Sequence, residues 1–207
     1  MARINVNPNR MELSRLKKRL VVARRGHKLL KDKQDALIKA FLERARSGKV
    51  LREQVEEELK ECYGAFVLSR AQTTPEILEQ ALIFPGANCT LSVDWRNVMS
   101  VMVPHYNVKQ EGNPVNYGFV NVPILLDLAL EQFSKLILRL LELAKEEKAI
   151  RLMAGEIERT RRRVNALEYV MIPDLQETIR YISMKLDEQE RSTLSRLMKI
   201  KDIVRAK

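Results

Sequence analysis

The sequence predicts a mainly α-helical protein, built as a long antiparallel two-helix coiled coil with a small central head. Three observations support this fold. Charged residues make up 31% of the 207 residues and aromatic residues only 5%, a composition typical of long helices. Both ends of the chain carry apolar positions at heptad spacing. The middle carries short runs with the two-residue period of a β-strand.

The first long helix is predicted over residues 1–70. Its apolar positions alternate by three and four residues from Leu13 onward, which indicates a coiled-coil seam. The predicted seam positions are Leu13, Leu16, Leu20, Ala23, His27, Leu30, Gln34, Leu37 and Phe41. His27 and Gln34 are polar, and polar core positions fix the register of a coiled coil at some cost in stability. Gly48 and Gly64 are the positions where this helix could be interrupted.

The head is predicted over residues 71–122. Thr74 as N-cap and Pro75 as first helical residue start a short helix that ends near Leu82. Residues 90–95 and 98–103 then predict a β-hairpin joined through 96–97, while 110–114 has loop composition and 117–120 could form a brief strand. The apolar positions assigned to the hairpin are Leu91, Val93, Val98, Val101 and Val103.

The second long helix is predicted over residues 123–207, with Pro123 as its first residue. Its first apolar positions are Leu126, Leu130, Phe133, Ile137, Leu140 and Ala144. Its seam continues through Ile157, Val164, Leu167, Met171, Leu175, Ile182 and Leu186, and the same pattern resumes at Leu197, Ile200 and Val204. Leu175 follows Met171 by four residues where three are due, so we expect a mild kink near Pro173.

The chain runs out along one helix and returns along the other, so the two helices must be antiparallel. A heptad period further predicts that they wind around each other with a left hand.

Basic residues are concentrated in the first helix. The net charge is +10, and residues 1–50 alone hold 15 Lys and Arg against 4 Asp and Glu. A basic block of this kind can bind nucleic acid, an anionic membrane surface or an acidic protein wall. We favour a protein partner and no nucleic acid, because neither helix brings a groove-reading module or stacking aromatics. A free-standing basic coiled-coil protein that binds nucleic acid or an anionic surface is the alternative.

Catalysis, cofactors and metals are not expected. No phosphate-binding loop or hydrolase signature is present, the two histidines lie in different segments, and the paired glutamates fall on predicted outer faces. Cys62 and Cys89 imply no disulfide framework. No apolar run of about 18 residues or signal core is visible, so we expect a cytoplasmic protein without membrane insertion.

Four segments resemble the signatures of one family. Residues 10–33, 97–104, 162–173 and 186–191 occur in the order seen in the D subunits of the V-type and archaeal-type rotary ATPases. The resemblance covers nearly the whole chain, and the end at Lys207 resembles bacterial or archaeal members. It implies paired terminal helices with a hairpin head, the central shaft of a rotary motor, and no active site in this chain.

The resemblance also implies partners and a cellular position. The shaft would insert into a hexamer of catalytic A and B subunits, bind the small F subunit of the stalk, and sit on a funnel-shaped subunit (C/d type) above the membrane ring. It would transmit torque between ATP hydrolysis or synthesis and ion translocation, peripheral to the membrane.

Basic residues on both helices are the candidates for sliding contacts with the hexamer, and residues near 40–60 and 130–150 are the candidates for binding the F subunit. The candidate hexamer contacts are Arg15, Lys17, Lys18, Arg24, Arg25, Lys28, Arg161, Arg162 and Arg163. The sequence leaves open the coupling ion, proton or sodium, the direction of the reaction and any regulatory role of the hairpin.

Overall fold

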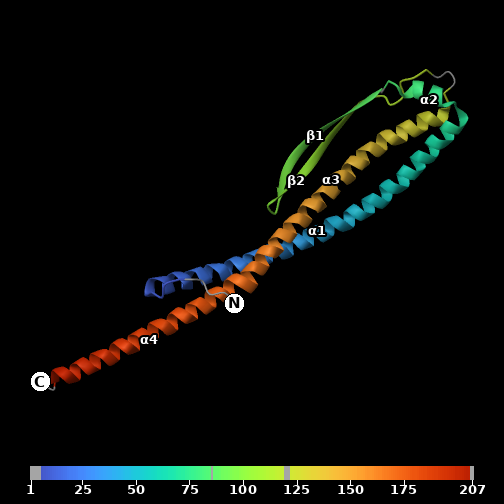
Figure 1. Ribbon diagram of the computed structural model, residues 1–207. Coiled ribbons are helices and arrows are strands. Elements are labelled where there is room, and N and C mark those ends of the chain that lie inside the picture. Colours follow the sequence, from blue (N-terminus) through green and yellow to red (C-terminus); the bar gives the residue numbers. More distant parts are fainter. Residues whose placement is uncertain (1–5, 85, 119–121, 206–207) are drawn as a thin grey trace. The chain divides into compact units, whose positions relative to one another are not determined.

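The computed structural model describes residues 6–84, 86–118 and 122–205 of the chain. Its elements are α1 (Arg10–Gln72), α2 (Pro75–Leu82), β1 (Ala87–Val98), β2 (Val101–Gly112), α3 (Ile124–Ala166), the π-helical turn η1 (Leu167–Met171) and α4 (Ile172–Arg205) (Figure 1). The mainly α fold with two long helical arms, a short helix and a hairpin is therefore confirmed. The chain divides into two compact units, unit 1 of Met1–Ala36 with Ile157–Lys207, and unit 2 of Leu37–Glu156.

Unit 1 joins the first part of α1 to η1 and α4. Its core consists of Leu16, Ala23, Leu175 and Ile182, with Leu13, Leu20, Leu167, Ile179 and Leu186 among the residues packed against it. Arg10 bonds to Glu190, and His27 lies opposite Glu168. Since the partner number falls as the α1 number rises, the two segments are antiparallel, as predicted.

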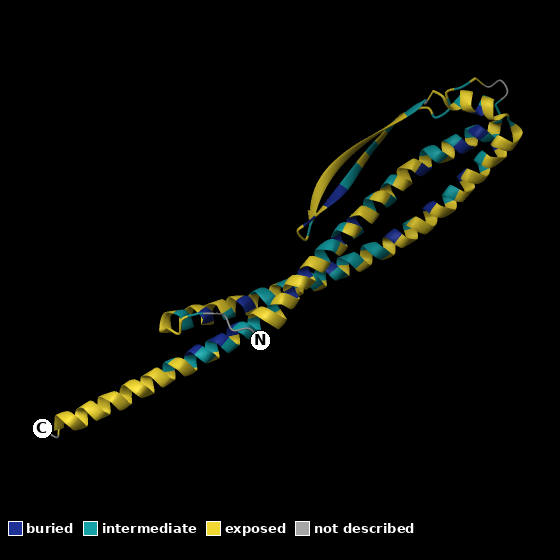
Figure 2. Ribbon diagram, in the orientation of Figure 1, coloured by how far each residue is buried: buried dark blue, intermediate teal, exposed yellow. Residues whose placement is uncertain are grey.

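Unit 2 joins the rest of α1 to the head and the first part of α3. Val55, Cys62 and Leu136 form its core, and Leu59, Phe133 and Leu143 pack against them. Arg44 pairs with Glu146, and Glu58 pairs with Arg139, so the helices are antiparallel here too. Buried residues recur as separate dark segments along both helices (Figure 2).

Helix α1 passes through its three glycines, Gly26, Gly48 and Gly64, without a break. Gly48 is buried, and a Cβ atom at this position would lie 3.1 Å from Cδ1 of Ile150. Its missing side chain therefore lets α3 approach closely. The close contact with Ile150 explains a glycine that costs helix propensity here.

The seam of α3 agrees with the predicted one at Leu126 and Phe133 and is shifted by one residue at most of the other positions. Leu126, Ala129 and Leu136 are buried, whereas Ile137 and Leu140 are exposed. Leu143 packs in the core while Ala144 is exposed. At 129–130, 136–137 and 143–144 two apolar residues are adjacent, and either one could lie in the seam. Spacing alone therefore led to the wrong residue of each pair.

The predicted heptad slip coincides with η1. The backbone N–H of Ile172 bonds to the carbonyl of Leu167, five residues back, which is the hydrogen bond of a π-turn. One extra residue is absorbed in this turn, so Leu167 and Leu175 both pack in the unit 1 core. Met171, predicted in the seam, is 43% exposed because it belongs to the widened turn.

The hairpin is longer than predicted, and its turn lies elsewhere. Strands β1 and β2 pair over twelve residues each, from Ala87 opposite Gly112 to Val98 opposite Val101. The turn is therefore Met99-Ser100 and not 96–97, and residues 110–112 belong to β2. Both turn residues have positive φ, 51° and 69°, the signature of a type I′ turn. A Met-Ser turn lacks the Asn or Gly that marks such turns in a sequence.

The junctions of the head lie within two residues of the predicted ones. Helix α2 begins at Pro75 with Thr74 as N-cap, although the Thr74 side chain makes no capping hydrogen bond. Helix α3 begins at Ile124, directly after Pro123, whose carbonyl accepts from the N–H of Leu126 at 2.9 Å. Tyr117 and Gly118 lie outside any strand, and residues 119–120 lie outside the described part of the chain.

Candidate partner-binding surfaces

The seam of unit 1 contains polar groups that are paired. Nε2 of His27 lies 3.3 Å from Oε2 of Glu168, which is the second residue of η1. Thr178 is buried, and its hydroxyl donates to the carbonyl of Asp174 at 2.7 Å. A helical Thr that bonds four residues back leaves no unpaired donor in the core. Both predicted polar seam positions, His27 and Gln34, are partly buried as expected of seam residues.

All nine candidate hexamer contacts lie in unit 1 and are exposed. Six come from α1 and three from the end of α3, just before η1. Arg15 has a side chain 79% exposed and lies 3.4 Å from Glu12, and Arg162 pairs with Glu158 one turn away. Exposed pairs of this kind hold the side chains only weakly, at about 0–1 kcal/mol each. The basic groups are thus free to contact another molecule.

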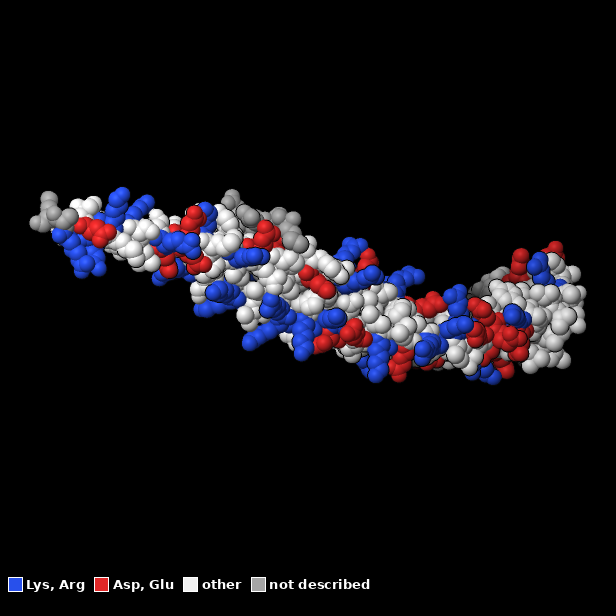
Figure 3. All heavy atoms as spheres, turned by 90° about the horizontal axis from the view of Figure 1, so that it is seen from below, with Lys and Arg blue, Asp and Glu red and all other residues white. Residues whose placement is uncertain are grey.

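Basic and acidic side chains gather over different parts of the molecule in the space-filling view. Basic side chains project along the helices on this face, and acidic ones gather over the part of unit 2 next to α2 (Figure 3). Ion pairs between α1 and α3 join Arg44 to Glu146 at 3.2 Å and Arg52 to Glu147 at 3.6 Å. Unit 2 therefore uses much of its charge internally, whereas the nine basic candidates of unit 1 face solvent.

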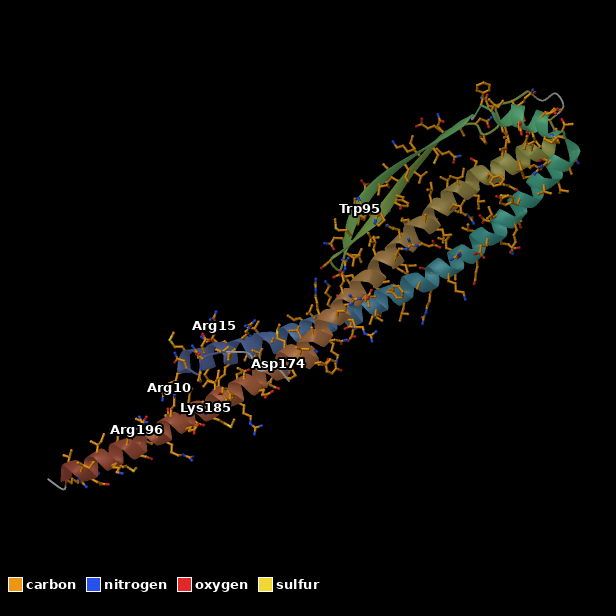
Figure 4. The ribbon with its side chains drawn as sticks, viewed as in Figure 1. Arg10, Arg15, Trp95, Asp174, Lys185 and Arg196 are labelled. Carbon is orange, nitrogen blue, oxygen red and sulfur yellow. The ribbon has the colours of Figure 1, made fainter. Side chains whose placement is uncertain are left out.

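The last part of α4 presents apolar side chains to solvent. Every residue from 187 to 205 is exposed. The exposed apolar residues are Leu194, Leu197, Met198, Ile200, Ile203 and Val204, and we call this set the α4 stripe. Helix α1 begins at Arg10, which already bonds to Glu190, so the described part of α1 offers the stripe no partner (Figure 4). Three of these positions continue the predicted seam, and nothing in their spacing indicated that they would lie unpaired.

The hairpin lies against α3 through β2. Gln110 of β2 bonds to Ser134 of α3, and Figure 1 shows β2 between β1 and α3. Val101 and Val103 are buried, whereas Leu91 and Val93 on β1 are exposed. Strand β1 is the outer strand, so its assigned apolar positions do not reach the core.

A cavity of about 240 Å³ separates the base of the hairpin from α3. Leu130 and Ile137, displaced from the predicted seam, line it together with Phe133, Cys89 and Tyr117. The hydroxyl of Tyr117 donates to Asp127, and burial together with this bond raises the pKa of Tyr117. The second apolar face of α3 thus supports the head, which explains the two alternative registers in its sequence.

The two cysteines differ in environment. Cys62 is buried in the unit 2 core, and desolvation raises the pKa of its thiol, assisted by the charges of Glu58 and Glu61. Cys89 is exposed on β1. Among the described residues no group of three or more metal-binding side chains is found, and no described helix is long and apolar enough to span a bilayer.

The fold defines a class of protein, antiparallel coiled coils with a β-hairpin inserted between their two helical arms. The profile of the ATP synthase D subunit family matches residues 12–202. The D subunit of the V-type ATP synthase of Thermoanaerobacter sp. (strain X514) is 52% identical over 206 residues, which cover 99% of both chains.

Two further relatives agree. The D subunit of the V-type ATP synthase of Clostridium novyi (strain NT) is 51% identical over 209 residues, covering 99% of this chain and 97% of its own. The D subunit of Clostridium botulinum (strain Langeland / NCTC 10281 / Type F) is 51% identical over 210 residues, with the same coverage. The chain belongs to the ATP synthase D subunit family.

Proposed function

We propose that this chain is the rotating central shaft of a V-type ATPase or ATP synthase and is itself not catalytic. It would transmit torque between ATP hydrolysis or synthesis in a hexamer of A and B subunits and the translocation of protons or sodium ions in a membrane ring. The observation that carries the proposal is the full-length similarity to relatives named as D subunits of V-type ATP synthases. The antiparallel pairing within both units is consistent with a torque-bearing element.

The exposed basic residues of unit 1 support a sliding contact. Individual exposed ion pairs are worth about 0–1 kcal/mol, so contacts with an acidic wall can exchange without deep energy minima. An asymmetric shaft that fits only one arrangement of the hexamer at a time is displaced whenever the hexamer changes state. The nine candidate residues would then share the load, and none would be indispensable alone.

The stalk partners are proposed on the same grounds. The small F subunit would bind near residues 40–60 and 130–150, and the funnel-shaped subunit would bind at the head. Both segments proposed for the F subunit lie in unit 2. The assembly would place this chain in the cytoplasm, peripheral to the membrane.

Group neutralisation tests the proposed hexamer contact. Changing Arg24, Arg25 and Lys28 to Gln should reduce torque and ATP-driven ion pumping in the assembled motor, because the shaft loses charge that faces the hexamer. The thermal unfolding of the free chain should not change, since these side chains are exposed.

A control removes two exposed basic residues of unit 2 that lie outside the segments proposed for the F subunit, Arg70 and Lys109. This control should leave torque closer to that of the natural chain. Equal torque in both variants and the natural chain would reject the assignment of the contact. Failure of the natural chain to copurify with the A and B subunits would reject the shaft itself.

A further inference from the structure

The outer edge of the hairpin has no neighbouring strand among the described residues. The sheet contains only β1 and β2, and β2 lies between β1 and α3 (Figure 1). Ten of the twelve residues of β1 are exposed, whereas β2 is buried over much of its first half. Twelve consecutive pairs without a bulge keep β1 regular over its whole length. The backbone groups on its outer side are therefore a row of unpaired donors and acceptors.

The turn determines which residues carry these groups. In a two-residue turn the flanking residues form a hydrogen-bonded pair, which here is Val98 with Val101. Bonded and non-bonded pairs then alternate along an antiparallel ladder, so the even-numbered residues of β1 bond to β2. The N–H and C=O groups of the odd-numbered residues Leu91, Val93 and Trp95 must point away from β2, toward the open edge.

The same three residues present an apolar surface. Side chains at alternate positions share one face of a strand, so Leu91, Val93 and Trp95 lie on one face of the hairpin. Their exposed fractions are 46%, 43% and 55%, and Figure 4 labels Trp95 on this outer strand. Thr90, Ser92 and Asp94 occupy the opposite face and are polar. An incoming strand would thus find hydrogen-bonding groups and an apolar contact along one line.

The edge has few of the features that protect exposed strands from pairing, and its charged residues, Asp94 and Arg96, lie on the face opposite Leu91, Val93 and Trp95. Proteins usually place lysine, proline, a bulge or an inward-pointing charge on such edges. Strand β1 contains no lysine and no proline, and its ladder has no bulge. Its acidic residue, Asp94, is engaged by the side chain of Asn107 at 2.6 Å.

We infer that β1 pairs in the assembled complex with an extended strand of a neighbouring subunit, which adds a third strand to the hairpin. The occupant would be a protein segment with an unpaired edge strand of its own and apolar residues on the face that continues Leu91, Val93 and Trp95. This inference rests on the proposed function, because a shaft at the centre of a hexamer is present once and has no second copy beside it.

Hydrogen exchange resolved to single amides tests the inference in the free chain and in the assembled motor. In the free chain the amides of Ser92 and Asp94 should exchange slowly and those of Leu91, Val93 and Trp95 rapidly. In the assembly these three outward amides should slow by about tenfold or more, since a hydrogen-bonded amide exchanges only when the strand opens. Ser92 and Asp94 should remain slow.

A substitution separates strand pairing from simple coverage of the surface. Val93→Pro removes one outward N–H, and edge strands tolerate proline where the N–H faces outward. Val93→Thr keeps the N–H and the branched shape, and is the matched control. In the assembly the proline variant should lose the slow exchange of Leu91 and Trp95, while the threonine variant should keep it. Slow exchange at Ser92 in the free proline variant verifies that the hairpin still forms.

Each alternative result is decisive. Rapid exchange of the outward amides in an intact assembly would overturn strand pairing and leave the proposed function standing. Continued slow exchange of Leu91 and Trp95 in the assembled proline variant would mean coverage without pairing. Slowing in the free chain that grows with concentration would assign the edge to a second copy. A chain that never enters the assembly would overturn both proposals.

Discussion

At the scale of single residues, the turn of the hairpin is the most unusual feature of the backbone. Met99 and Ser100 both have positive φ, a conformation that side-chain-bearing residues adopt at a cost of about 1–2 kcal/mol each. The Asn97 side chain offsets part of this cost, because its Oδ1 accepts the N–H of Ser100 at 2.8 Å. The turn is therefore held by a side chain that precedes it.

Replacing Met99-Ser100 by Asn-Gly should stabilise the hairpin by about 1 kcal/mol, because Asn-Gly suits a type I′ turn. The amides of Ser92 and Asp94 should then exchange about fivefold more slowly in the free chain. Asn97→Ala is the opposing control and should speed their exchange. Unchanged exchange in the Asn-Gly variant would show that the turn carries no strain.

Cys62 makes the free energy of unfolding depend on pH in the alkaline range. Burial raises the pKa of its thiol in the folded chain, so the unfolded chain loses this proton first as pH rises. The stabilisation by the neutral, buried thiol is fully present below about pH 8.5, the pKa of a thiol in an unfolded chain. It is lost as pH rises through the higher pKa of the folded chain. Urea unfolding between pH 7 and 10 should show a steeper loss of stability for the natural chain than for Cys62→Ala.

At the scale of elements, α3 shows where sequence patterns succeed and where they fail. The seam from Leu13 to Phe41 was predictable because its spacing alternates by three and four residues without a break. Apolar residues outside this spacing, such as Val22 and Leu29, are exposed. In α3 apolar residues are adjacent at 129–130 and 136–137, and one of each pair faces the other helix while its neighbour faces the head. When a helix buries two apolar faces, periodicity cannot tell which face packs against the other helix.

The corrected register predicts unequal effects of two neighbouring truncations. Leu136→Ala should lower the free energy of unfolding by about 2–5 kcal/mol, because a fully buried side chain leaves a cavity. Ile137→Ala should cost less than about 1 kcal/mol, since Ile137 is 41% exposed. Urea unfolding of both variants measures the difference. The reverse order would restore the register expected from spacing alone.

The π-turn η1 predicts that one residue can be deleted at this place. Leu167 and Leu175 are eight residues apart, and removing the exposed Val170 makes the separation seven, which is one regular heptad. The deletion variant should keep its helicity and melting temperature, as measured by circular dichroism. Deleting Ser183 from the regular part of α4 should instead lower the melting temperature, because Leu186 and the residues after it are then rotated by about 100° relative to the seam.

At the scale of the whole molecule, the two long helices have a packed seam over most of their length, whereas the described end of α4 is exposed on all sides. Arg10, the first residue of α1, pairs with Glu190 of α4, and the α4 stripe follows this pair along the chain. A stripe of six exposed apolar residues on one helix end is unusual for a chain that acts alone. The sequence showed the stripe but not its exposure, because exposure depends on where the other helix begins.

Removing residues 194–207 should leave the stability of the free chain unchanged, with a melting temperature within about 2 °C of the natural value. In the assembled motor of the proposed function the same truncation should reduce torque, because an exposed apolar stripe is a surface on which another subunit can pack. Leu175→Ala is the contrasting control and should lower the melting temperature of the free chain. A large loss of stability on truncation would mean that the stripe packs within the chain.

The contrast between the two cysteines has a practical consequence for experiments on the moving complex. Cys62 is enclosed in the core, so Cys89 is the one thiol of the two that a reagent reaches while the protein is folded. The natural chain can therefore be labelled at a single cysteine without any substitution. A fluorophore attached there would sit two residues from Leu91 and would sense directly whether the open edge of the hairpin is occupied as the motor turns.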